Sequence, residues 1–219
     1  MNVYVVMEDE VGAKKVYESW IPLVNPNLKL VSHPSQLIND NFVVYTGGGY
    51  PFIYELIKSA IEDANTYCNA DRIVIAVDSE NKTRDDRYTE IRERVATMAC
   101  RAEIKIVIQH FCFETWALGH KLLIGHNPKS KRLAKYRRFH NVHKLNPEEM
   151  PAYPEEELNR SQFAFEYLRL AINEKNHKLA YSKSNPSIVQ ESHFFEQVRR
   201  RFETTGHISS FQSFLEAFV

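Results

Sequence analysis

Four short apolar segments alternate with amphipathic ones in the first half of the chain, and this alternation constrains the fold more than any other feature. The apolar segments span residues 3–7, 41–45, 72–77 and 103–108. Each is rich in β-branched or aromatic residues and too short for a core helix, as is typical of strands buried on both faces of a parallel sheet. Apolar residues at helical spacing fill the gaps, at 11–23, 51–64 and 85–101. The sequence therefore predicts an α/β fold, with a mostly parallel sheet and helices on both faces.

The character of the chain changes near residue 126. Residues 126–144 are basic and aromatic, and residues 147–157 are acidic and interrupted by proline, which favours a loop. Periodic apolar residues predict further helices at 111–124, 161–174, 189–203 and 209–218. We expect an α/β domain at residues 1–125. Residues 126–219 are expected to form a basic linker and a helical C-terminal region packed on that domain.

The composition argues against several classes of protein. Lys and Arg number 28 against 28 Asp and Glu, so the formal net charge is zero and any basic surface for nucleic acid must be local. The three cysteines form no C-x-x-C pair, which argues against a disulfide framework or a zinc site and fits a reducing cytoplasm. No segment approaches the roughly 18 apolar residues of a membrane span, so we expect a cytoplasmic protein that makes no membrane contact.

Acidic residues follow two of the predicted strands. Glu8 comes directly after the first strand, and Asp78 and Glu80 follow the strand at 72–77. Ligands of open α/β sheets bind beyond the carboxyl ends of the strands. In extended backbone, Asp78 and Glu80 point to the same side, because side-chain direction repeats every second residue. Three carboxylates at one edge favour Mg²⁺ or Mn²⁺, which prefer hard oxygen ligands, although solvated loop acids are the simpler interpretation.

The order of these motifs resembles the TOPRIM fold. That fold is shared by topoisomerases, primases and OLD-type nucleases, and its motifs are an apolar strand ending in Glu-Gly and a second strand ending in Asp-x-Asp. Here Asp9 stands in the usual glycine position and Glu80 in the position of the second Asp. Phe-Glu-Thr-Trp at 113–116, which contains Glu114, is similar to an acid-before-aromatic motif of stand-alone bacterial TOPRIM-like proteins. The resemblance covers about residues 1–120.

The resemblance implies a TOPRIM/Rossmann-like sheet and a set of roles for the carboxylates. A Mg²⁺ or Mn²⁺ ion would be held by Glu8, Asp78 and Glu80. Glu8 would be a ligand or the general acid or base, and Glu114 a second-metal ligand or a supporting group. All four would belong to the catalytic site.

Three glycines and one basic stretch are further candidates. Gly47, Gly48 and Gly49 follow the strand at 41–45 and precede a helix, so their backbone N–H groups would contact phosphate, unless they form only a turn. Basic residues alternate with aromatic ones from 129 to 144, a pattern that fits phosphate contacts and base stacking, with a solvated helical face as the alternative. The expected nucleic-acid contacts are Lys82, Arg84, Lys129, Lys131, Arg132, Lys135, Arg137, Arg138 and Lys183.

These features together predict a Mg²⁺-dependent nuclease that hydrolyses the phosphodiesters of DNA or RNA. Two alternatives remain open. The first is a non-catalytic TOPRIM-like subunit that binds nucleic acid or a partner. The second is a small-molecule phosphoryl-transfer enzyme that uses the same acids and the glycine turn. The resemblance further implies a role as an effector or toxin in defence against phage, a separate ATPase subunit as partner, and a homo-oligomer as one form of assembly.

Overall fold

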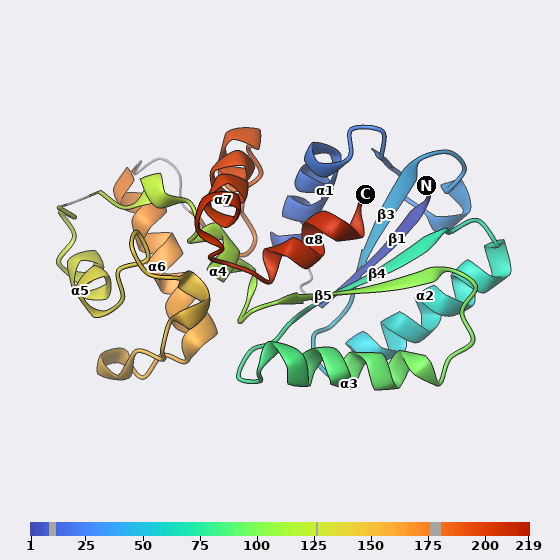
Figure 1. Ribbon diagram of the computed structural model, residues 1–219, viewed down its shortest axis with the longest axis horizontal. Helices are drawn as coiled ribbons and strands as arrows, with labels where there is room; N and C mark the ends of the chain where they lie inside the picture. Colours follow the sequence, from blue (N-terminus) through green and yellow to red (C-terminus); the bar gives the residue numbers. More distant parts are fainter. Residues whose placement is uncertain (9–11, 126, 176–180) are drawn as a thin grey trace.

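A five-stranded sheet forms the core of one half of the protein, the right half in Figure 1. The computed structural model describes residues 1–8, 12–125, 127–175 and 181–219. All strands are parallel, in the order β2-β3-β1-β4-β5. Their bounds are β1 Val3–Met7, β2 Lys29–Leu30, β3 Asn41–Thr46, β4 Arg72–Asp78 and β5 Glu103–Gln109. The predicted α/β class with a parallel sheet is thus confirmed, in an arrangement compatible with a TOPRIM/Rossmann-like fold.

Helices cover both faces of the sheet, because successive side chains of each strand point to opposite sides. In β4, Ile73, Ile75 and Val77 face the core between the sheet and helices α2 and α3. Val74 and Ala76 face the core on the side of α1. Figure 1 shows α2 and α3 on one face of the sheet, with α1 and α8 on the other. The bounds of these helices are α1 Gly12–Val24, α2 Ile53–Tyr67, α3 Arg84–Ala96 and α8 Phe211–Ala217.

The C-terminal half adds helices beyond one end of the sheet and then returns to its face (Figure 1). These helices are α4 Phe113–Ala117, α5 Lys131–Phe139, α6 Arg160–Lys175 and α7 Ser192–Thr205. Trp20 of α1 packs against Phe195 of α7 and Phe211 of α8, and its indole N–H donates to the Val189 carbonyl at 2.8 Å. One continuous apolar core therefore joins the sheet to the last two helices.

Three predicted elements differ from the structure. The helix expected at 85–101 ends at Ala96. The helix expected at 111–124 ends at Ala117, and a 3₁₀ turn follows at Lys121–Leu123. The reason is Gly119, where a Cβ would lie 2.8 Å from Ile208 and from the Trp116 carbonyl, so the chain turns at a point of close packing. The acidic segment expected to be a loop contains two 3₁₀ turns, Pro147–Glu149 and Pro154–Glu156. None of the described helices combines the length and apolarity needed to cross a membrane.

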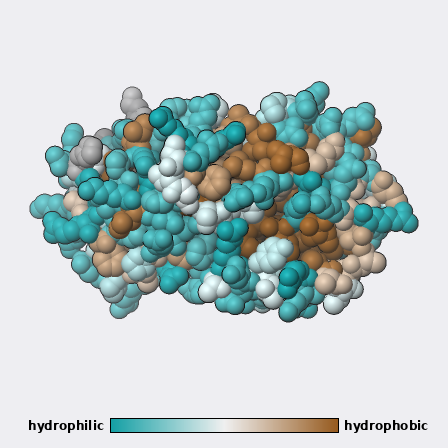
Figure 2. All heavy atoms as spheres, in the orientation of Figure 1, coloured by the Kyte–Doolittle hydropathy of each residue, from teal (hydrophilic) through white to brown (hydrophobic). Residues whose placement is uncertain are grey.

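The edge strand β5 is partly open to solvent. Figure 2 shows hydrophobic atoms reaching the surface between α8 and α3, and a hollow there is lined by Ile104, Ile106 and Ile108. Lys105 and Glu103 pair with each other on this edge. Charged side chains on an edge strand discourage pairing with a strand of another chain.

Candidate active site at the carboxyl edge of the sheet

The central strands β1 and β4 bring Glu8 and Asp78 together. The strands pair in parallel with Met7 opposite Ala76, so the residues that follow meet at one edge. The Glu8 N–H donates to the Ala76 carbonyl at 3.2 Å, and the Asp78 N–H donates to Glu8 Oε2 at 3.3 Å. Glu8 and Asp78, which were predicted to share a site, therefore lie at the same edge of the sheet. The backbone N–H of Asp78 links them by its hydrogen bond to the Glu8 carboxylate.

Three of the four predicted carboxylates line one pocket of about 530 Å³. Asp78 and Glu80 come from the end of β4 and the turn after it, and Glu114 comes from α4. Glu114 is buried and accepts a hydrogen bond from the Tyr181 hydroxyl at 3.0 Å. Arg132 and Lys183, both predicted to contact nucleic acid, line the same pocket. The structure thus gathers acids and bases from four distant parts of the chain around one cavity.

The turn after β4 does not follow the extended geometry that the sequence suggested. The Ser79 N–H donates to the Gln109 carbonyl at 3.0 Å, and the Glu80 N–H donates to the Phe111 carbonyl at 2.8 Å. Glu80 has φ of 50°, in the left-handed region, so the two-residue repeat of an extended strand is wrong at this position. Contact with the segment after β5, rather than strand geometry, places Glu80 beside the pocket.

Glu8 is partly buried, and this burial raises the pKa of its carboxyl above the usual value. The Asp78 N–H lowers the pKa, Glu80 raises it, and Arg87 and the Tyr50 N–H lower it. A carboxyl with a raised pKa holds a proton more readily than an ordinary one, which suits a general acid or base. Tyr50 directly follows the predicted glycine turn, where Gly48 and Gly49 have φ of 57° and 67°. The turn therefore lies beside Glu8, although it does not line the pocket.

Replacement of Glu8 by Gln is expected to stabilise the protein at alkaline pH. Because the folded-state pKa is raised, the folded protein retains a proton that the unfolded chain releases, and the free energy of unfolding falls as pH rises through the raised pKa. The glutamine of the variant does not ionise, so its free energy of unfolding does not fall with pH for this reason. Urea denaturation at a series of pH values should show the largest gain above the raised pKa and a shrinking gain as pH falls toward the ordinary value. Glu196→Gln, on the exposed side of α7, is the control and should show no such pH dependence.

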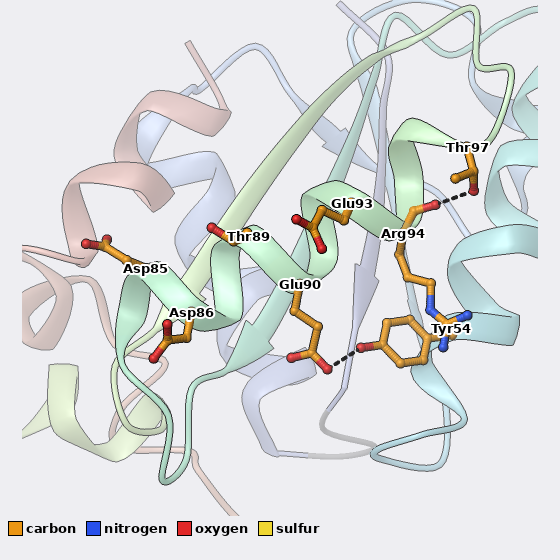
Figure 3. A pocket seen from close by; sticks show the side chains of 8 residues that line it. All are labelled: Tyr54, Asp85, Asp86, Thr89, Glu90, Glu93, Arg94 and Thr97. Carbon is orange, nitrogen blue, oxygen red and sulfur yellow. Dashed lines mark hydrogen bonds between the residues drawn. The ribbon is translucent and has the colours of Figure 1, made fainter.

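Lys82, one of the two basic residues predicted after β4, is held by Glu90 of α3 and does not line the pocket. Lys82 Nζ and Arg87 Nη1 lie 2.8 and 3.0 Å from Glu90 Oε2. The hydroxyls of Tyr50 and Tyr54 donate to Glu90 Oε1 at 3.0 and 2.8 Å, the latter drawn in Figure 3. Burial acts to raise the pKa of Glu90, but these donors and the charge of Arg87 together lower it to about 2. These five residues form the Glu90 cluster.

Glu90→Gln is expected to destabilise the protein by about 2 kcal/mol at neutral pH, because buried Arg87 loses its charged partner and two hydroxyls lose a charged acceptor. Since the folded-state pKa is lowered, this stability is present above the ordinary carboxyl pKa and is lost as pH falls toward about 2. Thermal unfolding from pH 7 down to the acid range should show the two proteins converging. The control is Glu93→Gln, one turn further along α3 in the same surface pocket and exposed (Figure 3). An equal loss in both variants would contradict the role given to Glu90.

Fewer residues of the basic stretch at 129–144 are available to contact nucleic acid than the sequence suggested. Arg132 pairs with Glu156 and, at 3.0 Å, with Glu166. Lys135 lies 3.5 Å from Glu155. Tyr136 is fully buried and stacks within a protein core, so it cannot serve as a platform for bases. The members of this stretch that are exposed and that form no ion pair among the described residues are Lys129, Lys131, Arg138 and Lys144.

The other basic candidates also include residues that do not reach the carboxylate pocket. Arg137 is half-buried, and its buried Nε has no hydrogen-bond partner among the described residues. Arg84 lines the hollow beside β5, with Ile104 and Glu216, and not the carboxylate pocket. Of the predicted nucleic-acid contacts, therefore, Arg132 and Lys183 are those that reach the pocket.

Several residues in or beside the pocket carry no functional signal in the sequence. Tyr181, which holds Glu114, comes from a segment without a motif. Cys112 is buried, and burial together with the charges of Glu114 and Asp78 raises the pKa of its thiol, so it stays protonated near neutral pH. Asn159, Gln162 and Phe165 line the wall formed by α6. Only the fold brings them to the carboxylates.

The carboxylates of the pocket fit a metal ion held partly by water and substrate, and not one enclosed by protein ligands alone. Within the described ranges, no three His, Cys, Asp or Glu side chains lie close enough together to hold a metal ion. The described residues therefore do not form an all-protein cage. Mg²⁺ is often held by only one or two carboxylates, with water and substrate phosphate completing its shell. Asp78 and Glu80 at one pocket satisfy that smaller requirement.

Comparison with known proteins does not place the chain in a family. No protein-family model matches it, and neither a curated protein nor a solved structure gives a match. The sheet and the pocket are therefore the basis on which its function can be argued.

Proposed function

We propose that this protein is a metal-dependent hydrolase of nucleic-acid phosphodiesters, with a TOPRIM-like site. The observation that carries the proposal is that Asp78, Glu80 and Glu114 line one pocket with Arg132 and Lys183, at the carboxyl edge of a parallel sheet. Ligands of open α/β sheets bind at this edge. A phosphodiester needs both kinds of group, since cations balance its charge and carboxylates handle metal and protons.

Each side chain has a role that follows from its position. Asp78 and Glu80 would hold Mg²⁺ or Mn²⁺, and the bound ion supplies charge neutralisation and acidifies water. Lys183 brings positive charge to the phosphate. Arg132 lines the same pocket, but its guanidinium is paired with Glu156 and Glu166 and holds the wall of the pocket. Glu8, whose pKa is raised by burial, takes and returns a proton at the edge beside Asp78. Tyr181 fixes the orientation of Glu114.

The non-catalytic alternative draws support from one observation. Because the described residues hold no cluster of three metal ligands, the pocket would also suit a subunit that binds nucleic acid without cutting it. The separate ATPase partner implied by the TOPRIM resemblance belongs to this alternative, whereas the role as an effector in defence against phage belongs to the hydrolase.

Metal binding and cleavage, measured on the same sample, test the function. Isothermal titration of the protein with Mn²⁺ and Mg²⁺ should show saturable binding. Single-stranded DNA, duplex DNA and RNA should then be incubated with and without the metal. We expect cleavage that needs the metal and stops on chelation. Metal binding without cleavage of any of the three would favour the binding subunit, and no metal binding would refute the hydrolase.

A further inference from the structure

The carboxylate pocket has a second wall that metal-dependent hydrolysis does not require. Besides acids and bases, it is lined by Phe165, Leu158 and the side-chain amides of Asn159 and Gln162. These four residues lie in the first turns of α6 or directly before it. An apolar surface with a few placed polar groups is the usual composition of a site for a small organic ligand.

The two amides are fixed, and the hydrogen bonds show which end of each faces the backbone. The Gln162 N–H donates to Asn159 Oδ1 at 2.9 Å, and the Asn159 N–H donates to Gln162 Oε1 at 3.0 Å. Because a backbone N–H can only donate, both amide oxygens must take these positions. The amide NH₂ groups are left as donors on two side chains that line the pocket. Such donors match the ring nitrogens and carbonyl oxygens of a nucleobase.

Phe165 supplies an aromatic surface beside these donors. Its ring is half-buried and lies 5.9 Å, between centroids, from the ring of Tyr181. The Tyr181 hydroxyl in turn binds Glu114. The aromatic wall is therefore held by the same residue that orients a carboxylate of the site. Aromatic side chains in such a position bind bases by stacking on either face.

We propose that this wall binds one unpaired nucleobase, so that the nucleotide unit at the site is single-stranded or flipped out of a helix. The inference rests on the proposed function and names its substrate class. The pocket, at about 530 Å³, falls in the range of small-ligand sites and is large enough for one nucleotide. A base inside a duplex is stacked on both faces and paired at its edge, so it can reach neither Phe165 nor the amides.

Anisotropy of fluorescent oligonucleotides tests the inference, with Glu8→Gln as background so that the strand is not consumed. Glu8 does not line the pocket. We expect an oligothymidylate to bind at least roughly tenfold more tightly than its duplex. Phe165→Leu, which keeps an apolar side chain, should weaken single-strand binding roughly tenfold, because stacking on an aromatic ring is lost. Phe202→Leu, at a partly buried ring of α7 outside the pocket, is the matched control and should bind normally.

An abasic strand separates base recognition from backbone contacts. The loss caused by Phe165→Leu should disappear on a strand that lacks its bases, since the two changes remove the same contact. Free thymidine monophosphate as competitor shows the source of the nucleotide. If the monophosphate displaces the oligonucleotide at an equal concentration, the ligand is a free nucleotide. If it displaces the oligonucleotide only weakly, the ligand is a strand. Either result supports a site for an unpaired base.

A second variant covers the case in which Phe165→Leu fails to fold. Gln162→Glu keeps an oxygen that accepts the Asn159 N–H, removes the NH₂ donors and adds one negative charge, which acts on both strands. It should unfold at the wild-type temperature and weaken binding of the thymidylate strand more than that of the abasic strand. Gln36→Glu makes the same change in another capping box, where Gln36 Oε1 accepts the His33 N–H, and should leave binding unchanged.

Two results would overturn the inference. One is a duplex that binds as tightly as the single strand, and the other is an equal effect of Phe165→Leu on the abasic strand. These failures differ from failure of the hydrolase. Metal-dependent cleavage of duplex alone would refute the base site and keep the hydrolase, whereas base-dependent binding without any cleavage would keep the site and refute the hydrolase.

Discussion

Asp78→Asn is expected to lower metal-dependent cleavage by roughly 10²-fold or more, because changes outside the ligands themselves already cost about 10–100-fold at metal sites. The amide keeps the shape of the carboxylate and removes its charge, so a cation in the pocket loses an anionic partner. Asp78 ends β4 at the centre of the sheet, and its side chain lines the pocket with Glu80 and Glu114. Rates of cleavage at saturating metal, together with the metal affinity, measure the effect.

The control for this substitution is Asp85→Asn. Asp85 is an exposed acid in the first turn of α3 and lines a different pocket, so the same chemical change should leave cleavage within about twofold. Equal rates for Asp78→Asn and wild type would show that the carboxylates are ordinary loop acids. A loss in Asp78→Asn with unchanged metal affinity would move Asp78 from holding the ion to positioning the substrate.

The strands and the parallel sheet could be predicted because their signal is local. The four longer strands are short apolar runs, and each is followed in sequence by a helix that cannot pair with it. The exposed two-residue strand β2 is not such a run. β3 and β5 lie within one residue of the predicted bounds at each end. The helix at 111–124 could not be predicted correctly, since its end depends on close packing of Gly119 against Ile208, far along the chain. Where a long-range contact determines the end of a helix, the local sequence pattern is not enough to predict that end.

The same distinction applies to the site. Glu8 and Asp78 could be placed at one edge because the carboxyl ends of parallel strands meet there. The basic stretch could not be judged from its sequence, since its partners Glu155 and Glu156 lie 20 and 24 residues further along. A run of positive charge in sequence shows nothing about the acids that fold against it. The amides before and within α6 form a capping-box pattern that marks the start of a helix, and their place at the pocket becomes visible only in the fold.

Arg201→Met is expected to destabilise the protein by about 3–5 kcal/mol, a large fraction of the stability of a domain of this size. Arg201 of α7 is 2% exposed. Its guanidinium donates to the carbonyls of His143, Val142 and Leu145 at 3.0, 3.0 and 2.8 Å. The contacts fix the segment after α5 against α7. Methionine fills much of the same volume but donates nothing, so three carbonyls in a poorly hydrated place lose their partner at once.

Arg200→Met separates this effect from the loss of a charge on α7. Arg200 is the preceding residue and is exposed, so its replacement should change the free energy of unfolding by less than about 0.5 kcal/mol. Urea denaturation of both variants measures the difference, and the midpoint of thermal unfolding should fall by roughly 10 °C in Arg201→Met alone. If both variants match wild type, the carbonyls find water or other donors, and Arg201 does not join the two segments. If Arg201→Met unfolds early yet still binds metal, the carboxylate pocket is stable without the α5–α7 connection.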